Sequence, residues 1–250
     1  MKKAIVTGAS SGIGMEIAEI LGEKGYYVIL VARREDKLKS VLGKLKCGGE
    51  IFPCDLSVTE NCIKLHETYK NDNIEVLVNN AGFGIFGKFS ETGLSRDLEM
   101  INLNISSLHA LTKLFLGDML KKDKGYILNV ASLASFMSGP LMGAYYASKA
   151  YVTRLSRAIS KEIKGSRVRI SVLCPGPVDT EFNNVAGVKF ALKPLSAKKV
   201  ADLSVKKMFK GKFYILPGTA AKFTAFFSKL IPDTILSECS MKIQKKKIKV

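Results

Sequence analysis

Thr7-Gly8-Ala9-Ser10-Ser11-Gly12-Ile13-Gly14 is the stretch of the sequence that decides the fold. It follows a short apolar run, Ala4–Thr7, and leads into an amphipathic pattern, Ile13–Lys24, so it is predicted to join a buried strand to a helix. Three glycines leave no Cβ in the way of a phosphate group that approaches the N-terminus of this helix. A glycine-rich turn can also be merely tight, but its place in the first strand–helix unit favours a dinucleotide site.

Outward from this turn, short β-branched runs alternate with longer helical patterns. Strands are predicted at Ala4–Thr7, Tyr27–Ala32, Glu50–Cys54, Ile74–Asn79, Tyr126–Ala131, Val168–Leu173 and Phe213–Leu216. Helices are predicted at Ile13–Lys24, Arg34–Lys46, Glu60–Lys70, Ser95–Lys121, Tyr145–Ile163 and Ala197–Phe209. Repeated strand–helix units require right-handed crossovers and a parallel sheet covered on both faces. The sequence therefore predicts an α/β fold: one Rossmann-type domain over 1–250, with a doubly wound sheet of about seven strands.

The composition excludes several classes of protein. Of 250 residues, 47% are hydrophobic and 24% are charged, which is typical of a globular chain. Five cysteines without a CxxC pair, and no signal peptide pattern, favour reduced thiols in a cytoplasmic protein. Two histidines, His66 and His109, are too few for a three-histidine metal site, and both fall in predicted helices. We expect no metal site.

The net charge of +17 is compatible with a phosphate-bearing ligand, an anionic membrane or nucleic acid. No compact basic stripe with interleaved aromatic residues is present, and five of the last ten residues are lysines, so we expect a solvated surface and no nucleic-acid partner. No window of 18 apolar residues exists. The stretch Ala220–Ile231 predicts a helix with one apolar face, compatible with membrane contact but favouring packing on its own domain or on a partner subunit.

The end of the second strand indicates the nucleotide. An NAD-binding domain places an acidic residue there, about 20 residues past the glycines, to hold the ribose 2′-hydroxyl. This chain has Arg33 and Arg34 instead, and guanidinium groups suit a 2′-phosphate. The following Glu35 and Asp36 leave open that one of them pairs with an arginine. The pattern favours NADP over NAD.

Four polar residues are predicted to converge at the strand ends: Asn104, Ser132, Tyr145 and Lys149. Tyr145 and Lys149 are four apart and share a helix face. Reduction of a carbonyl by hydride creates an alkoxide, so its site must supply a proton, and a nearby ammonium would lower the pKa of a phenol toward neutrality. Taken alone, the Tyr-x-x-x-Lys pair is also compatible with a helix start and a surface lysine.

The ordered set of motifs resembles the short-chain dehydrogenase/reductase family over nearly the whole chain, from Lys3 to about Gly218. The matching segments are TGASSGIG at 7–14, Cys54-Asp55-Leu56, Asn79-Asn80-Ala81-Gly82, the Asn104 helix, Ser132, Tyr145 with Lys149, and Pro175-Gly176-Pro177-Val178-Asp179-Thr180. The resemblance implies an oxidoreductase that interconverts a carbonyl and an alcohol by hydride transfer, and Arg33 and Arg34 predict that its cofactor is NADP(H). It also implies a homo-oligomer, either a dimer or a tetramer.

The resemblance assigns roles to the catalytic residues. Tyr145 would be the acid/base, Lys149 would bind the nicotinamide ribose and lower the pKa of Tyr145, and Ser132 would hydrogen-bond the substrate oxygen. Asn104 would hold a water that links Lys149 to solvent. The cofactor-binding residues implied are Gly8, Ser10, Ser11, Gly12, Ile13, Gly14, Arg33, Arg34, Asp55, Leu56, Asn80, Ala81, Gly82, Tyr145, Lys149, Pro175, Gly176, Val178 and Thr180.

The remaining expectations concern the substrate and the C-terminal part. Some NADP-preferring relatives carry a basic residue where this chain has Ser11, so the cofactor prediction depends on Arg33 and Arg34. Residues 181–212 resemble a substrate lid and helix, and 219–250 form a basic C-terminal helix and tail. An apolar pocket, or equally a core or subunit contact, is predicted for Phe83, Ile85, Phe86, Phe136, Met137, Leu141 and Met142. Two alternative functions stay open: a catalytically silent NADP(H) sensor, and a membrane-peripheral reductase of lipid-like ketones.

Overall fold

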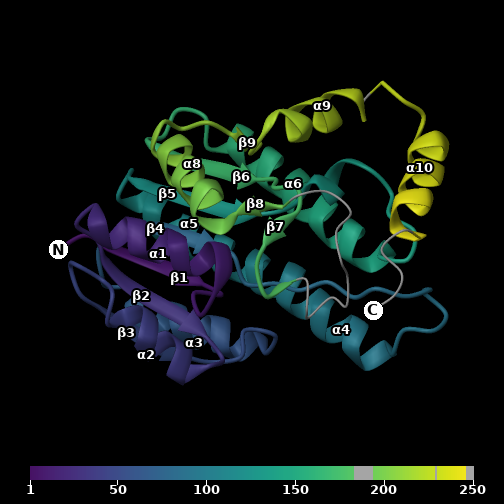
Figure 1. Ribbon diagram of the computed structural model, residues 1–250. Helices are drawn as coiled ribbons and strands as arrows, with labels where there is room; N and C mark the ends of the chain where they lie inside the picture. The colour runs from purple at the N-terminus through teal and green to yellow at the C-terminus, as the bar shows by residue number, and fades with distance from the viewer. Residues whose placement is uncertain (183–193, 229, 246–250) are drawn as a thin grey trace.

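A seven-stranded parallel sheet forms the centre of the molecule (Figure 1). The computed structural model describes residues 1–182, 194–228 and 230–245. The strand order is β3-β2-β1-β4-β5-β6-β9, so the direction of winding reverses between β1 and β4. The strands are β1 (Lys3–Thr7), β2 (Tyr27–Ala32), β3 (Gly49–Pro53), β4 (Ile74–Asn79), β5 (Gly125–Val130), β6 (Val168–Leu173) and β9 (Tyr214–Ile215).

Helices cover both faces of the sheet, as the apolar runs of the strands require. One layer holds α1 (Gly12–Glu23), α2 (Glu35–Leu42) and α8 (Ala197–Phe209), which share a core with β1 and β2. The other layer holds α3 (Thr59–Tyr69), α5 (Leu108–Lys121) and α6 (Gly143–Glu162). The predicted doubly wound α/β fold is confirmed, and every predicted strand of the sheet is present.

Three predicted helices differ from the structure. The predicted helix Ser95–Lys121 is divided into α4 (Leu94–Ile101), the π-helical turn η1 (Asn102–Ser107) and α5. The predicted helix Arg34–Lys46 ends at Leu42. The predicted helix Ala220–Ile231 is wrong in its extent: α9 (Thr219–Phe227) ends earlier, and a separate helix, α10 (Asp233–Lys245), begins after Pro232, whose ring cannot donate a helical hydrogen bond.

Two small elements were not predicted. A two-stranded sheet pairs β7 (Val178–Asp179) with β8 (Leu195–Ser196), and a 3-10 turn, η2 (Leu133–Phe136), follows β5. Residues 183–193 of the expected lid lie outside the described residues. Among the described helices, none has the length and apolar character needed to cross a bilayer. No group of histidine, cysteine and carboxylate side chains suited to a metal ion occurs in the part of the chain that the structure describes.

Candidate active site

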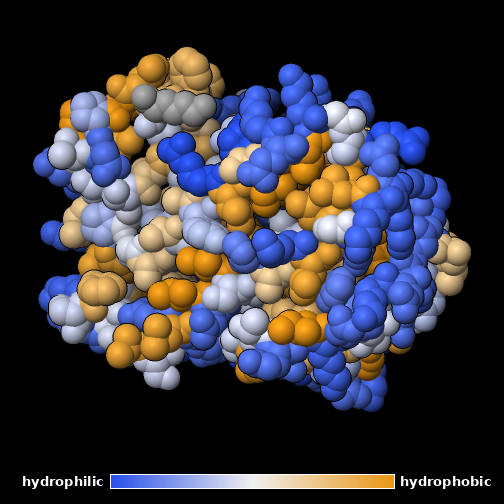
Figure 2. All heavy atoms as spheres, turned by 180° about the vertical axis from the view of Figure 1, so that it is seen from behind, coloured by the Kyte–Doolittle hydropathy of each residue, from blue (hydrophilic) through white to orange (hydrophobic). Residues whose placement is uncertain are grey.

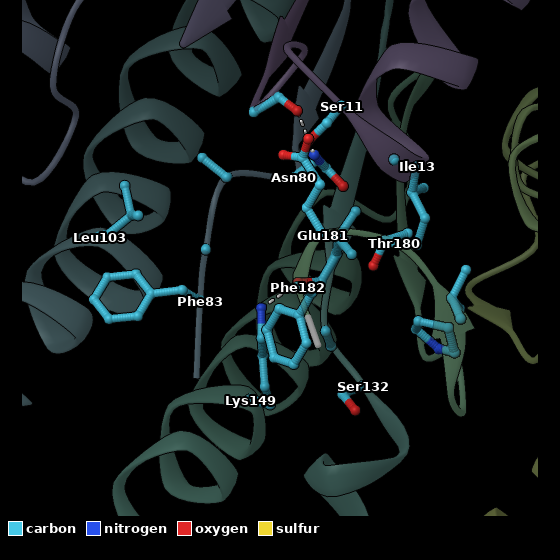
Figure 3. A pocket seen from close by; sticks show the side chains of 18 of the residues that line it. Ser11, Ile13, Asn80, Phe83, Leu103, Ser132, Lys149, Thr180, Glu181 and Phe182 are labelled. Carbon is cyan, nitrogen blue, oxygen red and sulfur yellow. Dashed lines mark hydrogen bonds between the residues drawn. The ribbon is translucent and has the colours of Figure 1, made fainter. Parts of the chain in front are cut away.

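One cavity of about 490 Å³ opens at the carboxyl ends of the strands, next to β1 and β4, between which the direction of winding reverses. This reversal point is where doubly wound sheets bind their ligands. All predicted site residues except Gly14 and Asn104 line this cavity. Figure 3 shows Ser11, Ile13 and Asn80 at one end of it and Ser132 and Lys149 at the other. The structure therefore brings the two predicted sites into a single groove.

The glycine-rich turn is built for close backbone approach. Gly8 and Gly12 have positive φ values of 64° and 56°, a conformation that L side chains rarely adopt. A Cβ added to Gly8 would lie 2.8 Å from the Asn80 side-chain nitrogen, and one added to Gly12 would lie 2.9 Å from a Thr180 methyl carbon. A Cβ at Gly14 would overlap the Gly8 carbonyl. The shape and the helix N-terminus fit the pyrophosphate of a dinucleotide.

Two neighbouring asparagines hold the ends of the central strands together. The Asn79 side-chain nitrogen donates to Asn129 Oδ1 at 2.9 Å, which ties β4 to β5. The Asn80 side chain donates to the Thr7 carbonyl oxygen at 3.0 Å, and the backbone N–H of Asn80 donates to Thr7 Oγ1 at 2.9 Å. These bonds tie β4 to β1 beneath the glycine turn. The Asn-Asn segment is thus part of the scaffold of the groove.

The two arginines after β2 line the groove, Arg34 lies against the glycine turn, and both arginines are paired with acids. Arg33 Nη1 lies 3.2 Å from Glu99 Oε1 and 3.7 Å from Asp55 Oδ2. Arg34 Nη2 donates to Ser10 Oγ at 3.1 Å and to Ser11 Oγ at 3.3 Å. Its closest partner is a carboxylate from a distant segment, Glu181, at 2.7 Å.

The question of which acid pairs with the arginines was open in the sequence. Glu35, which directly follows Arg34, pairs instead with Lys39 at 2.8 Å on the same helix. Glu181 was not predicted as a site residue. Its sequence signal was only that it follows Thr180, and its partner lies 147 residues earlier in the chain.

Tyr145 and Lys149 meet at the other end of the groove, one turn apart on α6. Tyr145 is 9% exposed and Lys149 is 5% exposed. Lys149 Nζ donates to the Val130 carbonyl oxygen at 2.9 Å and lies 5.8 Å from the centre of the Tyr145 ring. Ser132 follows β5 and lies on the same cavity. The alternative reading of Lys149 as a surface lysine is therefore wrong.

The electrostatics of this pair differ from the expectation that Lys149 lowers the pKa of Tyr145. Burial raises the pKa of Tyr145 to about 12, although a hydrogen bond with Ser132 opposes this shift. Burial also lowers the pKa of Lys149 to about 8. Both side chains are buried, and the loss of solvent around each of them disfavours its charged form. At neutral pH this pair is a neutral phenol beside an ammonium, which suits proton donation.

Asn104 lies in the π-helical turn η1 and faces protein rather than the cavity. Its side-chain oxygen accepts from the Phe83 N–H at 3.1 Å, and its nitrogen donates to the Phe83 carbonyl at 2.9 Å and to Ser148 Oγ at 3.1 Å. These bonds fix the chain after Gly82, where an added Cβ would lie 3.4 Å from Lys149 Nζ. The expected role of Asn104 in holding a water stays a prediction.

The end of the groove that holds Tyr145 has an apolar lining. Phe83 and Met142, two of the residues predicted for a pocket, line the cavity, whereas Ile85 and Phe86 pack into the small core behind it. Phe182 also lines it (Figure 3). The centre of the Phe182 ring lies 5.5 Å from that of the Tyr145 ring. Other lining residues that sequence reasoning missed are Val31, Ala32, Cys54, Leu103, Val130, Ala131, Leu133, Ala134, Tyr146 and Glu181. Most are apolar and carried no motif.

Fold and groove together define a dinucleotide-binding α/β protein with a tyrosine and a lysine beside its ligand site. Comparison with known proteins makes this more specific. The family model for short chain dehydrogenase matches residues 2–188. The Nostoc protein "Ketoacyl reductase HetN" is 32% identical over 211 residues, which cover 82% of this chain and 71% of the relative.

Two solved structures show the same similarity. A short-chain dehydrogenase from Sphingobium yanoikuyae in complex with NADPH superimposes with a TM-score of 0.85 at 25% identity, covering 92% of this chain and 94% of that one. A short chain dehydrogenase/reductase from Burkholderia phymatum in complex with NAD has a TM-score of 0.80 at 26% identity, covering 90% and 91%. The chain belongs to the short-chain dehydrogenase family and is an oxidoreductase of that family.

Proposed function

We propose that the protein is an NADP(H)-dependent reductase of apolar ketones or aldehydes, which also catalyses the reverse oxidation of the alcohol. The observation that carries this proposal is the meeting of Tyr145 and Lys149 in the same groove as the glycine cradle. The apolar lining from Phe83, Met142 and Phe182 supports a substrate with little polarity next to its carbonyl.

The residues of the groove divide the chemistry between them. A nicotinamide bound there supplies the hydride that reduces the carbonyl carbon. Ser132 donates a hydrogen bond to the carbonyl oxygen, and Tyr145 transfers its phenolic proton to that oxygen as negative charge develops. The Lys149 ammonium stabilises the resulting phenolate and binds the ribose hydroxyls. A phenol that is protonated at neutral pH suits this direction of reaction.

The preference for NADP is supported by charge. Arg33 and Arg34 lie on the groove, and the residue directly after β2 is not an acid. Relatives of known structure include complexes with NADPH and with NAD, so this chain's own residues carry the assignment. A 2′-phosphate is recognised best by guanidinium groups, which present several donors in one plane.

Turnover of the full-length protein tests the proposal. We expect Tyr145→Phe to abolish NADPH-dependent reduction of a panel of apolar ketones, because the proton donor is lost. The matched control is Tyr146→Phe, since Tyr146 lines the same cavity and its hydroxyl accepts from Gln244 at 2.8 Å. Retention of turnover in Tyr145→Phe would refute the assignment. If the wild-type protein binds NADPH but reduces no compound of a broad panel of ketones and aldehydes, the alternative function as a catalytically silent NADP(H) sensor is favoured.

A second candidate, a reductase that works at a membrane surface, is favoured by one observation. On α9, Phe223 and Phe226 are 63% and 61% exposed, and Phe227 is 46% exposed. Hydrophobic side chains gather at the corner of the molecule that holds α9 (Figures 1 and 2). This helix contacts η2, which directly follows Ser132. Together with a net charge of +17, the surface suits an anionic bilayer beside the substrate end.

Sedimentation with vesicles distinguishes the two candidates. A membrane enzyme would cosediment with vesicles of anionic lipid, and Phe223→Ser with Phe226→Ser would abolish this, with retained activity on a small dissolved ketone. No cosedimentation at low salt would reject the membrane candidate. Mass measurement in the same buffers tests the expected homo-oligomer, which stays a prediction.

A further inference from the structure

Glu181 contacts the start of α2 at the end of the groove that holds the glycine turn. Glu181 follows Thr180, and its two carboxylate oxygens have different partners: Oε2 lies 2.7 Å from Arg34 Nη2, and Oε1 lies 2.9 Å from Lys37 Nζ. Figure 3 shows Glu181 next to Phe182, on the side of the cavity toward Ser11 of the glycine turn. Both Arg34 and Glu181 line the cavity.

The donors around this carboxylate form an anion site. Arg34 Nη2 also donates to the hydroxyls of Ser10 and Ser11, so the guanidinium is held against the glycine turn where an adenosine ribose would lie. Hydrogen bonds from Lys37 and from Arg34 lower the pKa of Glu181 to about 2. The side chain is therefore fully anionic at neutral pH and occupies a site that presents two cations.

We propose that the Glu181 carboxylate occupies the 2′-phosphate site in the cofactor-free protein and is displaced by that phosphate when NADP binds. Glu181 is then a specificity-determining residue, which lowers the affinity for NADP while leaving NAD nearly unaffected. This inference rests on the proposed function, because it takes NADP as the cofactor.

The strengths of the charges favour such an exchange. The side chains of Arg34, Lys37 and Glu181 are 46%, 44% and 41% exposed, so solvent screens both ion pairs and each contributes little. A phosphate monoester carries nearly two negative charges at neutral pH and three acceptor oxygens, against one charge on a carboxylate. The phosphate therefore binds Arg34 and Lys37 more strongly than the carboxylate does, but it must first break the contacts of both side chains with Glu181. NAD has no 2′-phosphate and leaves both contacts intact.

Calorimetric titration with two nucleotide fragments tests the proposal without any need for turnover. Adenosine 2′,5′-bisphosphate carries the 2′-phosphate, and 5′-AMP lacks it. We expect Glu181→Gln to tighten binding of the bisphosphate about five-fold and to change binding of 5′-AMP less than about two-fold. Glu35→Gln is the matched control, because it removes the same charge next to Arg34 but breaks only a contact with Lys39. We expect it to change neither affinity by more than about two-fold.

Unchanged or weaker bisphosphate binding in Glu181→Gln would overturn the proposal, as would an equal gain for 5′-AMP. The variant Arg34→Ala separates this failure from failure of the NADP assignment. We expect Arg34→Ala to weaken bisphosphate binding more in the Glu181→Gln background than in the wild-type background, since Arg34 is then free to bind phosphate. No effect of Arg34→Ala in either background would mean that the 2′-phosphate site itself is wrongly placed. Loss of ketone reduction in Tyr145→Phe is independent of all these results.

Discussion

Lys149 is proposed to act in catalysis, and its burial lowers the stability of the folded protein. The residue is 5% exposed, and the described hydrogen-bond partner of its ammonium is a neutral carbonyl, that of Val130. Burial without a counter-charge disfavours the charged form, which is why the pKa is lowered to about 8. Residues of this kind are commonly retained for activity at the expense of stability.

We expect Lys149→Met to be more stable than the wild-type protein at pH 7, by about 1–3 kcal/mol in the free energy of unfolding. The unfolded lysine binds its proton up to about pH 10.5, whereas the folded one loses it near pH 8. Between these values the unfolded state holds more protons, so wild-type stability rises with pH and the advantage of the variant shrinks. Urea unfolding at pH 7 and pH 9.5 measures this. Lys161→Met, an exposed change on the same helix, is the control, and a less stable Lys149→Met at pH 7 would contradict the prediction.

The same pKa predicts a pH profile for the proposed reaction. The Lys149 ammonium is lost as pH rises through about 8, so its stabilisation of the Tyr145 phenolate is lost as well. We expect kcat/KM for ketone reduction to be level from pH 6 to about 7.5 and to fall above about pH 8. Initial rates at fixed ionic strength measure the profile. A level profile up to pH 9.5 would show that the charge on Lys149 is not required.

At the scale of elements, the β1–α1 unit is specified locally and tolerates little change. A methyl group at Gly14 would overlap the Gly8 carbonyl and the Asn80 amide, so the turn and the end of β4 would have to separate. We expect Gly14→Ala to lower the free energy of unfolding by about 1–3 kcal/mol and to weaken dinucleotide binding. Denaturant unfolding and NADPH titration measure these effects.

The control for this change lies in α5. Gly117 is exposed and has open space where a Cβ would lie. Alanine is the better helix former, so Gly117→Ala is expected to add about 0.5–1 kcal/mol. Two glycine-to-alanine changes would thus act in opposite directions, and similar effects in both would contradict the steric account of Gly14.

The elements also show where local patterns are insufficient. Continuous apolar runs predicted all seven strands of the sheet, and most of the predicted strand ends lie within about one residue of the observed ones. The runs are continuous because a strand that is buried on both faces must be apolar throughout. The π-helical turn at Asn102–Ser107 left no such mark, since its residues continue the helical periodicity on either side. The two-residue strands β7 and β8 are too short for any periodicity.

At the scale of the whole molecule, the net charge of +17 means that repulsion between positive side chains opposes the compact folded state. Ion pairs such as Arg34–Glu181 are mostly solvent-exposed and are weakened by salt, but the excess of cations is screened at the same time. We expect the repulsion to dominate. The urea midpoint of unfolding should therefore rise when KCl is raised from about 20 to about 300 mM, while the dependence of the unfolding free energy on urea concentration stays the same. Equilibrium unfolding over this range measures it. A midpoint that falls with salt would show that ion pairs dominate instead.

What the sequence determined by itself was local: the glycine turn between a strand and a helix, and the placement of Tyr145 and Lys149 one turn apart. Such features depend on backbone geometry over a few residues, and their spacing is visible without a structure. Tertiary structure decided the rest. It brought Glu181 to Arg34 across 147 residues, and it enclosed Tyr145 so that burial, rather than Lys149, sets its pKa. Distances between remote segments and the loss of solvent around a side chain exist only in the packed molecule.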